Sequence, residues 1–319
     1  MTSQMSHTRH LGQLSVNAMG LGCMPMSWAY GVDDIDPVEV RATLREAIDL
    51  GVTLLDTSDV YGPYTNEELL GSEIVDAGLR DKVQLATKCG LKTIDTFKYA
   101  YDGSAEHVRA ACDASLKRLK VDHIDLYQLH RTDPKVEIEE TWGAMAELIT
   151  AGKVGAIGLS EASLENLKRA QAIHPLTTLQ SELSLWSQDV LENGILDWCK
   201  ENNVGFLAFS PLGRGFLTGE VSSVSTYDFR AANPRFTEAA MAENQKIVDA
   251  ISTIATRLGI TNAQLALAWV LAQGENVVPI PGTKRRKWLR QNVTALEITL
   301  DAATMTELSN IPRSTIPRY

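Results

Sequence analysis

Short apolar runs alternate along the chain with longer segments in which apolar residues recur at helical spacing. The runs are typical of buried strands and cover residues 21–24, 52–55, 83–88, 124–130, 154–159, 177–181, 204–209 and 277–280. The helical spacing predicts helices at about residues 36–50, 67–75, 104–119, 137–150, 190–200, 239–258, 261–273 and 301–309, with others beginning near residues 163 and 284. Strands that alternate with helices in this way pair in parallel through βαβ units.

Eight strand-and-helix units in a chain of 319 residues match a (β/α)8 barrel in size. We therefore expect an α/β fold, a (β/α)8 TIM barrel, formed as a single domain by residues 1–319. Two short segments around Gly12 predict an N-terminal β-hairpin, and residues 301–309 predict an extra C-terminal helix. A doubly wound open sheet is the alternative architecture. No linker, low-complexity tract or long-period repeat divides the chain.

Local signals support several of these boundaries. Asp36 before Pro37 is typical of a helix start, with the acid as N-cap and proline in the first turn. Thr261 and Gln264 have the spacing of a capping box. Between the third strand and the helix that begins near Ser104, we expect a long loop.

Polar residues end the predicted strands at the positions where this barrel class carries its active sites. The second strand ends in Asp56, the third in Lys88 and the fourth in His130, and Tyr61 follows Asp56 in the next loop. Taken alone, each has an ordinary explanation as a turn cap, a solvated charge, a rim histidine or a packed aromatic ring. Together they predict an acid, an amine, an imidazole and a phenol at one rim.

These four side chains suit the protonation of a carbonyl oxygen while a hydride arrives at its carbon. A free phenol has a pKa of about 10, which is high for a proton donor at neutral pH. We expect the Lys88 ammonium to lower the pKa of Tyr61 by favouring the phenolate, and Asp56 to hold Lys88 charged and in place. His130 would donate a hydrogen bond to the carbonyl oxygen. Tyr61 is thus the predicted acid in reduction and the predicted base in oxidation.

The hydride requires a cofactor, yet the chain has neither a complete Rossmann fingerprint nor a Walker A motif. A nicotinamide is expected to lie over the barrel mouth, where Ser160 and Gln180 can bind its carboxamide and Phe209 can stack on its ring. Gly213, Arg214 and Gly215 offer close backbone approach and a cation for a pyrophosphate. Basic residues at a helix start, Lys284 to Arg286, suit a 2′-phosphate and favour NADP(H) over NAD(H).

The composition and net charge indicate which classes of binding partner to expect. A net charge of −10 argues against a nucleic-acid surface. No apolar run approaches the roughly 18–20 residues of a spanning helix, and the polar start lacks the apolar core of a secretory signal. The four cysteines have no metal-like spacing and are expected to be reduced thiols in a cytoplasmic protein. We therefore expect a small-molecule carbonyl substrate, no nucleic acid, no membrane and no metal; nothing in the sequence predicts an oligomeric state.

Over nearly its full length the chain resembles the aldo-keto reductases. The motifs that carry the resemblance are residues 55–62 with Asn66 and Glu67, residues 87–88, 128–130 and 157–160, Gln180, and residues 209–213 and 280–283. The resemblance implies that Asp56, Tyr61, Lys88 and His130 form an active-site tetrad. It also implies a barrel that binds extended NADPH without a Rossmann domain and reduces aldehydes and ketones.

The resemblance extends to residues with binding roles. It implies a cofactor site that includes Gly22, Met24, Asp56, Ser160, Gln180, Phe209, Ser210, Pro211, Leu212, Gly213, Arg214, Gly215, Gly282, Thr283, Lys284, Arg285, Gln291 and Asn292. Gln291 and Asn292 would contact the adenine. Trp28 and Tyr30 are the expected substrate-pocket walls, and the other loops expected around the mouth contain Tyr64, Phe97, Trp186 and residues 221–236.

Two departures from the family pattern stand out. Many members have asparagine after the serine that matches Ser160, whereas this chain has Glu161. Glu161-Ala162-Ser163 is similar to the branch that contains perakine reductase and auxin-induced-like plant proteins. Second, the aromatic ring that many members stack on the nicotinamide is tyrosine, whereas here it is Phe209, which keeps the stacking surface and lacks the hydroxyl.

Two other functions are compatible with a barrel of this kind. One is a regulatory or interaction protein that binds the cofactor with little turnover. The other is a metal-dependent hydrolase, for which His130 and Asp56 supply too few ligands.

Overall fold

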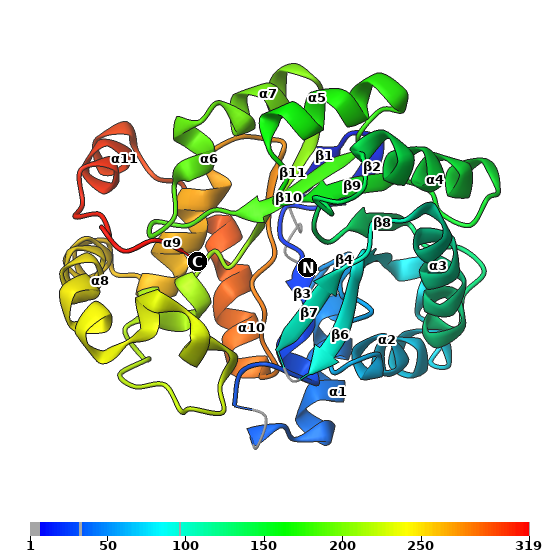
Figure 1. Ribbon diagram of the computed structural model, residues 1–319. Helices are drawn as coiled ribbons and strands as arrows, with labels where there is room; N and C mark the ends of the chain where they lie inside the picture. The colour runs from blue at the N-terminus through cyan, green and yellow to red at the C-terminus, as the bar shows by residue number, and fades with distance from the viewer. Residues whose placement is uncertain (1–6, 32–33, 96, 319) are drawn as a thin grey trace.

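Eight parallel strands form the central sheet, in the order β12-β11-β10-β9-β8-β5-β4-β3, and helices surround them (Figure 1). The structure is a computed structural model that describes residues 7–31, 34–95 and 97–318; the first six residues of the polar start lie outside this range. The sheet closes on itself where Gly22 in β3 bridges in parallel to Gly282, and the amide of Gly20 donates to Pro279 O at 3.0 Å. The predicted (β/α)8 architecture is confirmed.

The strands of the barrel are short and almost completely buried. They are β3 (Leu21–Gly22), β4 (Leu54–Asp56), β5 (Gln84–Cys89), β8 (Leu126–Leu129), β9 (Ile157–Ser160), β10 (Thr178–Glu182), β11 (Gly205–Phe209) and β12 (Val277–Pro279). A parallel sheet covered on both faces needs continuous apolar runs rather than alternation, which is why these strands were visible in the sequence.

The helices begin largely where capping residues predict them. They are α1 (Pro37–Asp49), α2 (Thr65–Leu70), α3 (Ala105–Leu119), α4 (Ile138–Thr150), α5 (Leu164–Ile173), α6 (Asp189–Glu192), α7 (Ile195–Glu201), α8 (Glu238–Leu258), α9 (Asn262–Leu271), α10 (Arg286–Val293) and α11 (Ala302–Ser309). Asp36 caps α1, and Thr261 with Gln264 forms the predicted capping box of α9. The extra C-terminal helix is α11.

Two predicted helices differ from the structure in their continuity. The segment expected as one helix over 190–200 is divided into α6 and α7, because Asn193-Gly194 lies between them and Gly194 adopts a left-handed φ of 76°. The segment expected over 67–75 continues from α2 into a π-helical turn, Gly71–Val75. Gly71 allows a close approach to α3, because a Cβ there would lie 2.4 Å from Arg118 O.

The prediction of a long loop after the third barrel strand is wrong. Residues 91–95 and 98–101 form a second hairpin, β6 (Leu91–Asp95) and β7 (Lys98–Tyr101), paired antiparallel. Its strands are short and largely exposed apart from Leu91, so they carry no continuous apolar run that would reveal them in the sequence. The hairpin follows the C-terminal end of β5 and brings aromatic side chains to the barrel mouth.

The N-terminal hairpin, β1 (Thr8–Leu11) and β2 (Leu14–Asn17), packs against the inside of the barrel. Leu11 and Val16 belong to the apolar cluster that fills the barrel interior together with residues such as Leu54, Leu126 and Leu207. A second and larger cluster lies between the strands and the helices. The hairpin therefore completes the interior core at the end of the barrel opposite the mouth.

Gly205 is the residue that lets this hairpin approach β11. A Cβ at position 205 would lie 2.5 Å from Leu11 Cβ and 2.6 Å from Leu11 Cα. Gly205→Ala is expected to lower the free energy of unfolding by about 1–3 kcal/mol, because the hairpin backbone must move to admit the methyl group. Urea denaturation measures the change. Gly143→Ala is the control, since Gly143 lies in α4 with no atom within 4 Å of its added Cβ; equal losses in both variants would contradict the account.

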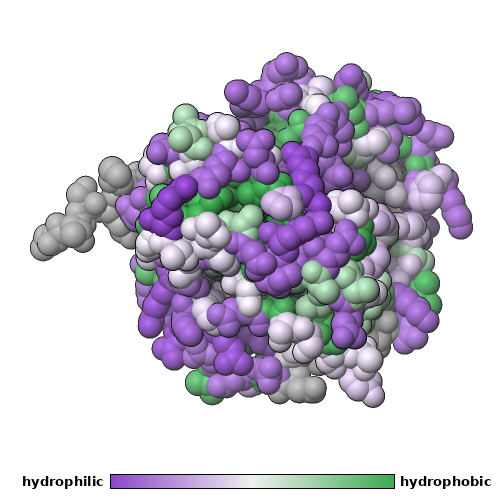
Figure 2. Space-filling view, turned by 90° about the vertical axis from the view of Figure 1, so that its left-hand side faces the viewer, coloured by the Kyte–Doolittle hydropathy of each residue, from purple (hydrophilic) through white to green (hydrophobic). Residues whose placement is uncertain are grey.

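The outer face over α8 and α11 is mainly hydrophilic, with apolar side chains gathered in a hollow between more polar ones (Figure 2). In the described part of the chain, no helix has the length and apolar character needed to cross a membrane.

Candidate active site

A cavity of about 630 Å³ opens at the C-terminal ends of the barrel strands, where β4, β8, β9, β10 and β11 deliver side chains to its wall. Its volume lies within the range of small-molecule sites. The predicted residues Tyr61, Asp56 and His130 line it, and Lys88 lies just beneath its floor with no exposed surface.

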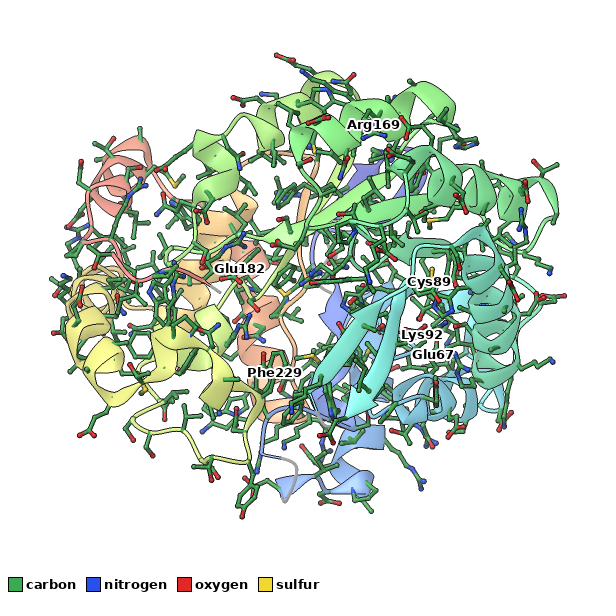
Figure 3. The ribbon with its side chains drawn as sticks, in the orientation of Figure 1. Glu67, Cys89, Lys92, Arg169, Glu182 and Phe229 are labelled. Atoms are coloured by element: carbon green, nitrogen blue, oxygen red, sulfur yellow. The ribbon has the colours of Figure 1, made fainter. Side chains whose placement is uncertain are left out.

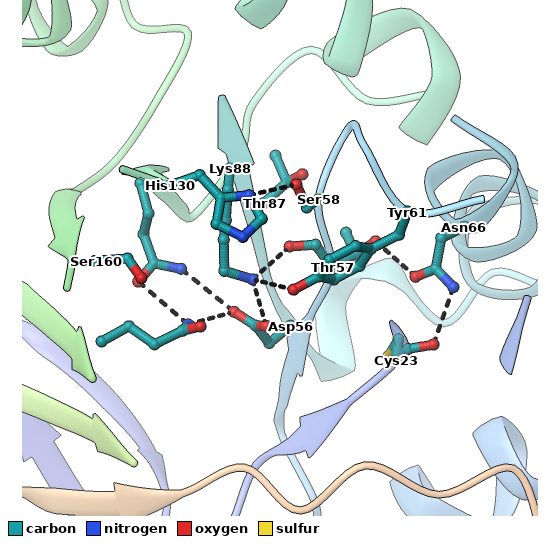
Figure 4. Close-up of polar contacts among 12 residues, drawn as sticks. Cys23, Asp56, Thr57, Ser58, Tyr61, Asn66, Thr87, Lys88, His130 and Ser160 are labelled. Carbon is teal, nitrogen blue, oxygen red and sulfur yellow. Dashed lines mark hydrogen bonds and ion pairs between the residues drawn. The ribbon is translucent and has the colours of Figure 1, made fainter. Parts of the chain in front are cut away.

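Lys88 joins Asp56 and Tyr61 (Figure 4). Its ammonium donates to Asp56 Oδ1 at 2.5 Å, to the carbonyl of Thr57 at 2.8 Å and to the Tyr61 hydroxyl at 3.4 Å. These three acceptors use the three protons of the ammonium group. The other oxygen of Asp56 accepts from Gln180 Nε2 at 2.7 Å and from Gln128 Nε2 at 3.3 Å. The carboxylate and the amine are thus both held in fixed positions below the phenol.

The protonation state of this pair follows from competing effects. Burial alone would lower the pKa of Lys88, but the nearby Asp56 and Tyr61 outweigh it, and the pKa of the amine is raised. For Tyr61, burial is the largest effect and raises the pKa of the phenol; the Lys88 charge opposes it without reversing it. Lys88 thus acts on the pKa of Tyr61 in the expected direction, but the net shift is upward, because the sequence did not show how fully the phenol is buried.

His130 lies beside Tyr61, with the two rings nearly perpendicular and their centroids 5.9 Å apart. Burial, followed by the charges of Arg131 and Lys88, lowers the pKa of His130 well below its usual value, so the imidazole is neutral. Its Nδ1 lies 3.1 Å from Ser58 Oγ. The same hydroxyl also lies 3.1 Å from Asp59 Oδ1, to which it donates. In the alternative arrangement, in which Ser58 donates to Nδ1, the ring proton is on Nε2 and available to a substrate oxygen.

Most of the residues predicted to bind the cofactor line the cavity. They are Gly22, Met24, Asp56, Ser160, Gln180, Phe209, Ser210, Pro211, Leu212, Arg214, Gly215, Gly282, Thr283, Lys284 and Arg285. Three do not. Gly213 faces away, since a Cβ there would lie 2.8 Å from Trp186 Cε3. Gln291 and Asn292 lie farther along α10 than Trp288, which reaches the cavity wall.

The segment after β11 is unusual in its backbone. Ser210, Gly213, Arg214 and Gly215 all have left-handed φ angles, of 48°, 56°, 56° and 93°. A left-handed conformation costs a non-glycine residue roughly 1–2 kcal/mol, so Ser210 and Arg214 hold a strained backbone at the cavity wall. On the opposite wall, Lys284 Nζ donates to Tyr30 O at 2.9 Å and to Gly31 O at 2.5 Å, which ties the segment after β12 to the loop after β3.

An aromatic wall covers Tyr61. The Trp28 ring stacks on Tyr61 with centroids 5.9 Å apart and contacts Phe97 at 5.1 Å and Phe229 at 5.6 Å. Phe229 lies beside the β6–β7 hairpin (Figure 3). The centroids of the Phe229 and Phe97 rings are 5.3 Å apart. Trp28 and Tyr30 line the cavity as predicted.

Sequence reasoning missed several residues of this wall and misplaced two others. The missed residues include Tyr99, Tyr101, Arg131 and Trp288, and also the apolar Pro25, Val60 and Leu91; Phe229 and Arg230 fall in the predicted range 221–236 without having been singled out. The side chains of Tyr64 and Trp186 do not line the cavity: Tyr64 is exposed beside Arg118, and Trp186 is buried against Phe216. The tyrosines are placed by the unforeseen hairpin, whereas Arg131 follows His130 directly and could have been found from that position.

Within the described ranges, no group of three or more histidine, cysteine, aspartate or glutamate side chains is arranged to hold a metal ion.

A model of the Aldo/keto reductase family matches residues 18–312 of the chain. The chain belongs to the aldo/keto reductase family. A relative from Glycine max, "Probable aldo-keto reductase 1", is 43% identical over 295 residues, which cover 92% of this chain and 84% of that protein.

Solved structures of the family are similar over almost the whole chain. A glycerol dehydrogenase from Gluconobacter oxydans has a TM-score of 0.84 at 27% identity, with 96% of this chain and 95% of that chain covered. An aldo-keto reductase from Klebsiella pneumoniae, in complex with NADPH, has a TM-score of 0.73 at 29% identity, with 96% and 95% covered.

Glu161, which departs from the usual aldo/keto reductase pattern, and Asn66, which belongs to the matching motifs, are both engaged by other groups in this structure. Glu161 accepts from Ser181 Oγ at 2.5 Å and from the Glu182 amide at 3.0 Å, and it pairs with Arg318 at 3.1 Å. Asn66 is buried and donates to Cys23 O at 2.9 Å. Neither side chain lines the cavity.

Proposed function

We propose that this aldo/keto reductase catalyses the NADP(H)-dependent reduction of an aldehyde or ketone to an alcohol. The observation that carries the proposal is the arrangement of Tyr61 over Lys88, with Lys88 paired to Asp56 and His130 beside the phenol at the wall of one cavity. Four groups that handle a proton and a developing charge thus meet where a carbonyl oxygen can reach them.

The residues present fit NADP(H). Gly22 and Gly282 present only backbone to the cavity, because a Cβ at Gly22 would meet Ile280 O at 2.9 Å and one at Gly282 would lie 3.1 Å from Pro25 Cδ. Phe209 offers a ring face at one end of the cavity, and Arg214, Lys284 and Arg285 offer cations for phosphates. The NADPH complex of the Klebsiella pneumoniae relative supports the same cofactor for this chain.

The nicotinamide would supply the hydride when bound, and this chain would supply the proton and hold the oxygen. Tyr61 donates its hydroxyl proton to the substrate oxygen, and the Lys88 ammonium stabilises the phenolate that is left. Neutral His130, in the tautomer that Ser58 sets by donating to Nδ1, would donate a hydrogen bond from Nε2 to the same oxygen. Asp56 keeps the amine charged in a site where burial favours its neutral form.

The raised pKa of Tyr61 predicts how the rate depends on pH. Reduction needs the protonated phenol, so its kcat/KM is expected to be flat from about pH 6 to about pH 9 and to fall as pH rises through the pKa of Tyr61. Oxidation needs the phenolate, so its kcat/KM is expected to rise about tenfold per pH unit over the same range. Initial rates in both directions check this. An apparent pKa near neutrality in the reduction profile would contradict it.

The experiment that tests the function is NADPH oxidation by purified protein with 4-nitrobenzaldehyde, followed by a panel of aldehydes and ketones and by a comparison with NADH. Turnover is expected, with a higher kcat/KM for NADPH. Tight NADPH binding with no turnover across the panel would overturn the proposal and leave a cofactor-binding regulatory protein.

The proposal also includes the branch of the family, the location in the cell and the contacts to the adenine. Glu161-Ala162-Ser163 supports placement in the branch that contains perakine reductase. The four cysteines are buried and unpaired, which is compatible with the proposed cytoplasmic location. Adenine contacts by Gln291 and Asn292 stay a prediction.

A further inference from the structure

Arg131 lies at the wall of the cavity, one residue after His130 at the end of β8. One guanidinium nitrogen, Nη1, donates to the His130 carbonyl at 2.6 Å and to Ser160 Oγ at 3.1 Å. These bonds tie the side chain to the ends of two adjacent strands, β8 and β9. The guanidinium is therefore held in place beside the imidazole that faces the reacting oxygen.

The charge of Arg131 has no counter-ion in the structure. No carboxylate among residues 7–31, 34–95 and 97–318 lies within ion-pair distance of it, and its Nε and Nη2 donate to none of these residues. Burial raises the pKa of Glu161, but Arg318 and the bonds from Ser181 and Glu182 outweigh it, with a smaller lowering from Arg131; the carboxylate itself is bonded to Ser181 and paired with Arg318. Burial of an arginine in protein is normally accompanied by an anionic partner.

Two other basic residues of the cavity have their charged groups engaged, whereas Arg285, like Arg131, has no carboxylate within ion-pair distance among the described residues. Arg230 pairs with Asp228 at 2.8 Å, and Lys284 is bonded to two backbone carbonyls. The partly buried Arg118 and Arg80, outside the cavity, also have carboxylate partners, at 2.6 Å and 2.7 Å. Arg131 thus combines a fixed position at the reaction end of the cavity with unused donors and an unneutralised charge.

The geometry points to Arg131 as an anion-binding subsite of the substrate pocket, which selects carbonyl substrates that carry a carboxylate close to the reacting carbonyl. 2-Oxo acids and short aldehyde acids have this chemistry, and an apolar or aromatic remainder would lie against Trp28 and Phe229. The inference rests on the proposed reductase function. A guanidinium suits the role because its planar donors match the two oxygens of a carboxylate.

The kinetic test compares phenylglyoxylate with its methyl ester, which lacks the negative charge but adds a methyl group and has a more electrophilic ketone, so the change of the ratio between variants is the measurement that decides. The wild-type enzyme is expected to have the higher kcat/KM for the acid. Arg131→Met is expected to lower the acid-to-ester ratio of kcat/KM by about 10- to 100-fold, and Arg131→Lys is expected to restore part of it. A ratio that does not change in Arg131→Met would overturn the inference.

Arg285→Met is the matched control, because Arg285 also lines the cavity but lies at the end proposed for the cofactor phosphates. With NADPH saturating, its acid-to-ester ratio is expected to equal that of the wild type. An equal fall of the ratio in both variants would show that the general positive field, and not Arg131, selects the acid.

A binding test does not depend on turnover and separates this inference from the proposed function. Titration calorimetry of the protein saturated with NADP⁺ is expected to show that benzoate binds and benzamide binds at least tenfold more weakly, and that Arg131→Met removes the difference. Loss of affinity for NADPH itself in Arg131→Met, with benzoate and benzamide equal in the wild type, would assign the arginine to the cofactor and overturn the inference.

Discussion

Tyr61→Phe is expected to lower kcat for carbonyl reduction by about 10³-fold, because the variant keeps the ring and loses the hydroxyl above Lys88. The affinity for NADPH should change little, since the hydroxyl faces the substrate side of the cavity. Stopped-flow single turnovers measure the hydride-transfer rate, and fluorescence titration measures NADPH binding.

Tyr101→Phe provides the matched control. Tyr101 lines the same cavity, but its side chain is 54% exposed on the β6–β7 hairpin, so its variant should reduce substrates at close to the wild-type rate. Turnover by Tyr61→Phe equal to that of this control would end the assignment of Tyr61 as the proton donor.

Lys88→Met is expected to have two separable effects. Reduction should slow by about 10²- to 10³-fold, because no ammonium stabilises the phenolate. The free energy of unfolding at neutral pH should fall by about 3–5 kcal/mol, because Asp56 is 3% exposed and loses its charged partner. Urea denaturation and steady-state kinetics measure the two effects.

A second substitution distinguishes charge from packing. Adding Asp56→Asn to Lys88→Met removes the unpaired carboxylate, so part of the stability should return while activity stays low. Lys246→Met, on the exposed face of α8, is the control and should change neither quantity. A double variant that regains activity along with stability would show that Lys88 acts only through the fold.

The residues that meet at the barrel mouth could be predicted from the sequence because the fold is so regular. Apolar runs located the strands, and βαβ connection orders consecutive strands side by side, so Asp56, Lys88 and His130 had to share one rim. The tyrosine five residues after Asp56 then lies above them. In such a barrel the neighbours of each strand follow from its position in the sequence. Contacts between residues at the ends of neighbouring strands can therefore be predicted from the sequence.

What the sequence did not reveal depends on packing between distant segments. The aromatic wall requires the β6–β7 hairpin and Phe229 to meet over Trp28, and neither segment carries a strong periodic signal. The direction of the pKa shift of Tyr61 depends on how far burial outweighs one nearby charge, which only the folded environment decides. The missing counter-ion of Arg131 is likewise a property of side chains from several strands.

The parallel bridge between Gly22 in β3 and Gly282, which closes the barrel, has a consequence for synthesis in the cell. The bridge joins Gly22 in the first barrel strand to Gly282, about 260 residues later, so the ring of strands cannot close until Gly282 has left the ribosome. During translation the β3 edge stays open to other chains. Elongation speed and chaperone supply, rather than final stability, should therefore set the yield of folded protein.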